Sequence, residues 1–142
     1  SNLAGKAINI SKTTAAHAWS YAITSHYNIP HGHAVWLTLP HIFELHATAA
    51  ASDVSDPRGA THLNIIMNEL LNIWGITSAD KSAAKLRQYL QSLSVESDLA
   101  KLGADTEEKR EFLSKQVNIQ RMSNNPVGLT LRKINHIFQL SD

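Results

Sequence analysis

The chain has 142 residues, 43% of them hydrophobic and 18% charged, and Lys plus Arg exceed Asp plus Glu by one. This balance is typical of a single globular domain, and the near-zero charge without a basic block argues against nucleic-acid or membrane-surface binding. The absence of cysteine excludes disulfides, thiolate metal sites and cysteine nucleophiles, and neither a membrane span nor a signal peptide is expected.

The spacing of apolar residues predicts helices along most of the chain, and the short alternating stretch at residues 6–10 cannot found a sheet. In chain order the predicted helices cover residues 13–25, 30–51, 63–74, 80–93, 106–117 and 130 onward. Their expected N-terminal caps are Ser11 or Thr13, Thr77 or Ser78, Asp105 or Thr106, and Thr130. The predicted fold class is therefore all-α, with one helical domain over residues 1–142.

The helix predicted at residues 30–51 is apolar on nearly every side, which is typical of a helix buried at the centre of its protein. Two histidines lie near its start, at His31 and His33. Such a helix at the centre of a small domain suggests that a ligand binds at its histidine-bearing end.

His17 lies in the first predicted helix, and His31 follows it by 14 residues, so a helical hairpin can bring the two imidazoles together. Imidazole is a common ligand for iron, zinc and nickel. Two imidazoles do not complete a site, however, and no Asp or Glu occurs in residues 1–43. From this spacing alone, a metal site and purely structural histidines both remain open. His33 points about 200° away from His31 on a helix, so it is interpreted as a cleft wall or a neighbour of the ligands.

Three motifs follow one another near the start of the chain: His17-Ala18, then Pro30-His31-Gly32 after a 14-residue step, then an apolar run ending in Leu39-Pro40. The chain ends on NNPVGLTLRKINHIF, with a threonine before the last helix. In these motifs the sequence resembles the iron-containing alcohol dehydrogenases. The resemblance implies a helical bundle similar to the C-terminal domain of dehydroquinate synthase-like enzymes and iron-containing alcohol dehydrogenases.

The resemblance also implies a divalent metal, Fe²⁺ or alternatively Zn²⁺, held by a D-x-x-x-H helix and by two histidines that map onto His17 and His31. Neither a D-x-x-x-H motif nor a glycine-rich phosphate loop occurs in the 142 residues. We therefore expect this chain to be the C-terminal metal-binding part of an enzyme whose N-terminal domain binds NAD or NADP.

The position four residues after His17 carries a second histidine in many family members and is Tyr21 here. A tyrosine one turn away shares the face of His17 and can donate a hydrogen bond, but it is a poor general base near neutral pH. Tyr21 and His33 are the candidate catalytic residues. The usual proton relay is in doubt, and the substrate is expected to differ from simple linear alcohols.

The expected function is NAD(P)-dependent interconversion of an alcohol and an aldehyde or ketone by a full-length, cytoplasmic homo-oligomer. The chain alone is expected to fold, to bind metal weakly and to be inactive. Two alternatives stay open: a relative of the glycerol dehydrogenases or sugar-phosphate cyclases, and a non-enzymatic helical interaction module with structural histidines.

Overall fold

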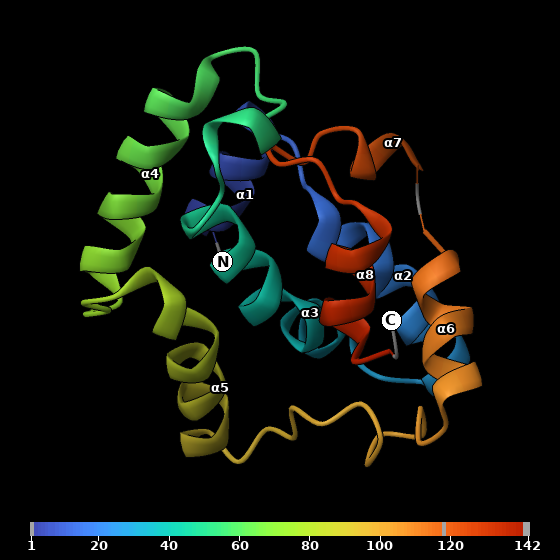
Figure 1. The fold of residues 1–142 in the computed structure, drawn as a ribbon. Helices are drawn as coiled ribbons and strands as arrows, with labels where there is room; N and C mark the ends of the chain where they lie inside the picture. The colour runs from blue at the N-terminus through green and yellow to red at the C-terminus, as the bar shows by residue number, and fades with distance from the viewer. Residues whose placement is uncertain (1, 118, 141–142) are drawn as a thin grey trace.

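A computed structural model describes residues 2–117 and 119–140, which fold into helices joined by loops (Figure 1). The α-helices are α1 (Asn2–Ile10), α2 (Ala15–Tyr27), α3 (His31–Ala47), α4 (Gly59–Ile73), α5 (Ser82–Ser92), α6 (Glu107–Lys115), α7 (Ile119–Met122) and α8 (Leu131–Phe138). Short 3₁₀ turns cover Ala51–Asp53 and Ala79–Lys81. No strand occurs in the described ranges, where an isolated β-bridge pairs Val54 with Val127. The all-α prediction is confirmed.

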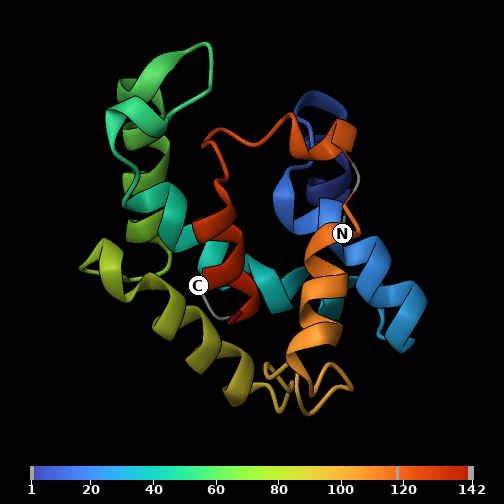
Figure 2. The same cartoon turned by 45° about the vertical axis from the view of Figure 1, so that its right-hand side comes forward.

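Helix α3 lies at the centre of the fold and packs against α2, α4, α5 and α8. Figure 2 shows it running between α4 and α5 on one side and α2 and α6 on the other. Ala34, Leu37 and Ile42 on this helix are at most 5% exposed. The prediction of a buried central helix is therefore confirmed, although the helix ends at Ala47, four residues earlier than expected.

Two apolar clusters share α3 and fix the position of its neighbours. One contains Trp19 of α2, Leu113 of α6 and Phe138 of α8, and the other contains Phe43 of α3 with Leu63 of α4. The Trp19 ring meets Phe138 edge-on at 5.2 Å between centroids, and its Nε1–H donates to the Ser114 carbonyl at 3.0 Å. Burial of such side chains contributes about 1.5–3 kcal/mol each. Helix α2 is thus held firmly between α3, α6 and α8.

The starts of α2 and α5 differ from the predicted caps. Helix α5 begins after Lys81, so neither Thr77 nor Ser78 caps it, and the Ser78 side chain makes no capping bond. Thr106 caps α6 as expected, since its hydroxyl accepts a backbone N–H three residues later. Helix α2 instead begins after Thr14, whose side chain makes no capping bond. Neither Ser11 nor Thr13 caps it. The Ser11 hydroxyl donates to the Ala7 carbonyl of α1, and the Thr13 hydroxyl accepts from Arg121.

Two helices were not predicted, α1 and α7. No residue of α1 is buried, and Leu3, Ile8 and Ile10 are 59–89% exposed. An apolar pattern that alternates over a few residues, as in α1, does not signal a helix. No helix in the described part of the chain is long and apolar enough to cross a membrane.

Candidate metal centre

The connection between α2 and α3 determines where the two histidines lie. Asn28 adopts the left-handed conformation at φ 52°, which asparagine tolerates better than most residues. Ile29 is buried, and Pro30 precedes the first turn of α3. The chain thereby turns back along α2, so that His31 stands beside Ser20 rather than beyond the end of the helix.

Three rings gather at this point. The His17 and His31 centroids are 5.5 Å apart at an interplanar angle of 59°, and the Tyr21 and His31 centroids are also 5.5 Å apart. His17 is half-buried, whereas His31 is exposed and Tyr21 is 43% exposed. The cluster is therefore partly buried at His17 and open to solvent at His31 and Tyr21.

Ser20 lies next to the ring cluster and is fully buried. Its hydrogen bonds determine which nitrogen of His31 carries the proton. Its hydroxyl donates its single proton to the His17 carbonyl at 2.9 Å. The contact of 3.3 Å between the Ser20 Oγ and the His31 Nδ1 is then donated by the ring N–H. This tautomer leaves the lone pair on Nε2, the nitrogen available to bind a metal.

The surroundings of His17 favour its neutral form. Burial lowers its pKa, and so does the electrostatic influence of the neighbouring His31 and Arg121 side chains. A neutral imidazole is the form that ligates a metal. Arg121, on α7, places its guanidinium 5.0 Å from the centre of the Tyr21 ring and donates to the Thr13 hydroxyl.

His33 makes a separate contact. Its Nε2 lies 2.6 Å from the Glu96 carbonyl oxygen, and because a carbonyl only accepts, the ring donates this hydrogen bond. His33 thus joins the start of α3 to the loop that follows α5. The structure brings His17, Tyr21 and His31 together and places His33 on another side of the helix.

His46, near the end of α3, is half-buried and does not belong to the ring cluster. It donates from Nε2 to the Asn125 side-chain oxygen at 3.0 Å. Burial lowers the pKa of His46 to about 4, even though the hydrogen bond to Asn125 favours the charged form. It is therefore neutral at physiological pH and ties α3 to the segment before α8.

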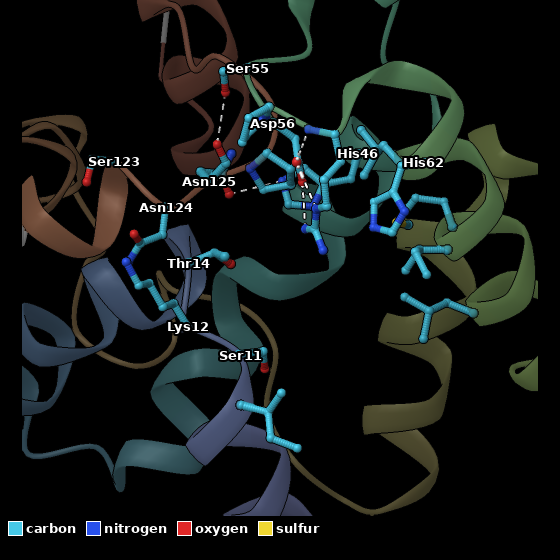
Figure 3. A pocket seen from close by; sticks show the side chains of 18 residues that line it. Ser11, Lys12, Thr14, His46, Ser55, Asp56, His62, Ser123, Asn124 and Asn125 are labelled. Carbon is cyan, nitrogen blue, oxygen red and sulfur yellow. Dashed lines mark hydrogen bonds and ion pairs between the residues drawn. The ribbon is translucent and has the colours of Figure 1, made fainter.

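A cavity of about 720 Å³ opens between the end of α1, the loop at residues 55–58, helix α4 and residues 123–126. Figure 3 shows its lining, with His46 and His62 on one side and Lys12 beside Asn124 on the other. The adjoining hollow of about 430 Å³ includes Arg121. No sequence pattern marks Lys12 or Arg121 as functional, and the contact of Arg121 with Thr13 joins residues 108 positions apart.

The donor set fits part of a metal centre. His17 and His31 supply two imidazoles on one open face, which suits a first-row divalent metal. Within residues 2–117 and 119–140, however, no three His, Cys, Asp or Glu side chains lie close enough to hold an ion together. A complete site therefore needs further ligands, and a carboxylate among them would offset the charge of the metal.

Residues 1–141 match the family model described as the Fe-containing alcohol dehydrogenase family, C-terminal. A phosphonoacetaldehyde reductase of Streptomyces viridochromogenes is 28% identical over 122 residues, which is 86% of this chain and 30% of the reductase. The match thus spans less than a third of that relative's length. No solved structure matches the chain.

Proposed function

Because the chain belongs to the Fe-containing alcohol dehydrogenase family and matches its C-terminal part, we propose that it is the metal-binding part of an NAD(P)-dependent oxidoreductase. The full-length enzyme interconverts an alcohol and an aldehyde or ketone. The observation that carries this proposal is the open pair of imidazoles, His17 and His31, at the α2–α3 hairpin.

His17 and His31 would hold a divalent metal, with Fe²⁺ proposed and Zn²⁺ as the alternative. When bound, such an ion polarises a carbonyl group, and reduced nicotinamide supplies a hydride. Overall, the carbonyl carbon gains the hydride, the π electron pair moves to oxygen, and the oxygen takes one proton. An aldehyde, NAD(P)H and H⁺ thus give an alcohol and NAD(P)⁺.

The remaining residues of the cluster position these groups. Ser20 fixes the tautomer of His31 through its hydrogen bond to Nδ1. Tyr21 faces the same opening, 5.5 Å from the His31 ring, and we assign its hydroxyl to a hydrogen bond with the reacting oxygen. His33 acts at a distance, through the backbone of Glu96 that it holds, and shapes the wall of the substrate cleft.

Other parts of the enzyme lie outside these 142 residues under this proposal. They are a D-x-x-x-H helix that completes the ligand set and an N-terminal domain that binds most of the NAD or NADP. We propose that the isolated chain is inactive for that reason, and that the complete enzyme is a cytoplasmic homo-oligomer.

We propose an aldehyde as the substrate, and a phosphonate-bearing aldehyde as its first candidate. The support is the relative named for the reduction of phosphonoacetaldehyde, together with Tyr21 in place of the histidine that many family members carry. The motifs PHGHAV at residues 30–35 and NNP at residues 124–126 favour a dehydrogenase over a cyclase.

The test uses the full-length protein and two readouts. Elemental analysis is expected to find about one divalent metal per chain, and its removal by a chelator should abolish aldehyde-dependent NAD(P)H oxidation. His17→Ala and His31→Ala should each lose the metal, whereas His26→Ala, which replaces an exposed histidine on α2, should keep it. Undiminished turnover after metal removal, or full metal content in the His17 and His31 variants, would overturn the proposal.

A further inference from the structure

We infer that the hollow beside Lys12 and Arg121 binds an anionic group of the substrate, a phosphonate or a similar oxyanion. The inference rests on the proposed function, because it places the far end of an aldehyde whose carbonyl reacts at the histidine pair. It assigns recognition of the charged group of the substrate to the side chains of Lys12 and Arg121.

The hollow has the composition of an oxyanion site. Its volume is about 430 Å³. It is lined by Lys12 and Arg121 together with the polar side chains of Ser11, Thr13, Ser123 and Asn124. None of the lining residues that the structure describes is acidic, and the lining offers two cationic side chains together with several hydrogen-bond donors. Tetrahedral oxyanions are recognised by this combination.

Arg121 connects the hollow with the metal centre. Its guanidinium lines the hollow, donates to Thr13 and lies 5.0 Å from the Tyr21 ring centre. Tyr21 in turn stands 5.5 Å from the ring of His31. Arg121 and the imidazole pair thus contact the same tyrosine ring, and we place the anionic end of the substrate at Arg121 and its carbonyl at the imidazole pair.

The guanidinium is also held in place before any ligand arrives. The Thr13 hydroxyl and the Tyr21 ring fix its orientation, and a planar guanidinium offers two parallel N–H groups to an oxyanion. Lys12 lines the same hollow, so an oxyanion bound there would face both cationic side chains.

The first experiment compares two aldehydes of nearly the same shape in the full-length enzyme. Phosphonoacetaldehyde carries the anion, and 3,3-dimethylbutanal replaces the phosphonate with a neutral tert-butyl group. The wild type is expected to prefer the anionic aldehyde in kcat/KM. Arg121→Gln should raise KM for it by about 10–100-fold with little change in kcat, the effect of losing a charge-assisted hydrogen bond. For the neutral aldehyde KM should rise far less, because that substrate offers no anionic group to Arg121.

The controls separate charge from shape. Arg132→Gln removes an exposed arginine on α8 and should leave both aldehydes unaffected. Arg121→Lys keeps the charge and should retain part of the preference. If Arg121→Gln fails to fold, the same comparison of the two aldehydes is made with Lys12→Gln. Lys12 is exposed and lies outside the helices, so its replacement should not affect folding.

A second readout does not depend on turnover. Isothermal titration calorimetry with methylphosphonate should show binding to the wild type that weakens about 10-fold or more in Arg121→Gln. In kinetics, methylphosphonate should compete with the aldehyde. Competition with NAD(P)H instead would assign the hollow to the nucleotide and overturn the inference.

The outcomes distinguish this inference from the proposed function. Equal use of both aldehydes by the wild type, or an unchanged preference in Arg121→Gln, overturns the anion site and leaves the oxidoreductase standing. If neither aldehyde is reduced, the proposed function fails, and methylphosphonate binding that depends on Arg121 still supports the anion site.

Discussion

Replacing Ser20 with alanine tests how the metal centre is organised. The Ser20 hydroxyl is fully buried, donates to the His17 carbonyl and accepts from the His31 Nδ1–H. Without it, nothing on α2 selects the tautomer that leaves Nε2 of His31 free. Loss of a hydrogen bond that orients a metal-binding histidine typically costs 10–100-fold in metal affinity, or roughly 1.4–2.7 kcal/mol.

The expected effect on folding is smaller than the effect on the metal. Ser20→Ala removes one hydrogen bond within α2, which contributes about 0.5–1.5 kcal/mol, and it adds no volume. His31 is exposed, so its Nδ1–H can turn to water instead of being left buried without a partner. In this variant, metal affinity should therefore fall by more than the free energy of unfolding.

The assay is competition for Co²⁺ or Zn²⁺ between the full-length protein and a chelating indicator, with denaturant unfolding of the apoprotein measured in parallel. Ser25→Ala is the matched control, because Ser25 is an exposed serine on the same helix. If Ser20→Ala and Ser25→Ala bind metal with the same affinity, the tautomer argument is wrong.

Three further predictions concern other parts of the chain. His31→Ala should remove the metal, whereas His33→Ala should retain it and lower kcat/KM by about 100-fold at most; elemental analysis beside kinetics distinguishes them. The free energy of unfolding should fall as the pH drops from about 6.5 toward about 4. In this range His46 takes up a proton in the unfolded chain, whereas in the folded protein its pKa of about 4 keeps it neutral. Denaturant midpoints across that range should fall less steeply for His46→Gln, and equal slopes would contradict the assignment. Gly103→Ala should destabilise by roughly 1–3 kcal/mol, since residue 103 has φ +111° and its Cβ would lie 2.8 Å from an aromatic ring; Gly5→Ala, in open space on an exposed helix, should be neutral or slightly stabilising in thermal unfolding.

The helices were predictable where periodicity extends over several turns, but the buried face is narrower than the pattern suggests. On α4, Leu63, Met67 and Leu71 are buried as expected, while Ile66 is 39% exposed. Leu93 is 55% exposed because α5 ends one residue before it. Neighbouring elements decide which part of an apolar stripe is covered, and a single helical pattern does not contain that information.

The imidazole pair was predictable because it is local. His17 and His31 are 14 residues apart, and their intervening turn is marked by Asn28 and Pro30. The contact of His33 with Glu96 and that of Arg121 with Thr13 join segments 63 and 108 residues apart. Only the tertiary fold determines such contacts, so a sequence pattern cannot reveal them.

This difference in sequence separation has a kinetic consequence. A hairpin closed over few residues loses little chain entropy and forms early, whereas contacts between distant segments form late. During synthesis, α2 and α3 are complete long before residue 121 leaves the ribosome. The nascent chain can therefore pair its two imidazoles at a stage when Arg121 does not yet exist. Closure of the α2–α3 hairpin would thus precede the contacts of Arg121 with Thr13 and Tyr21.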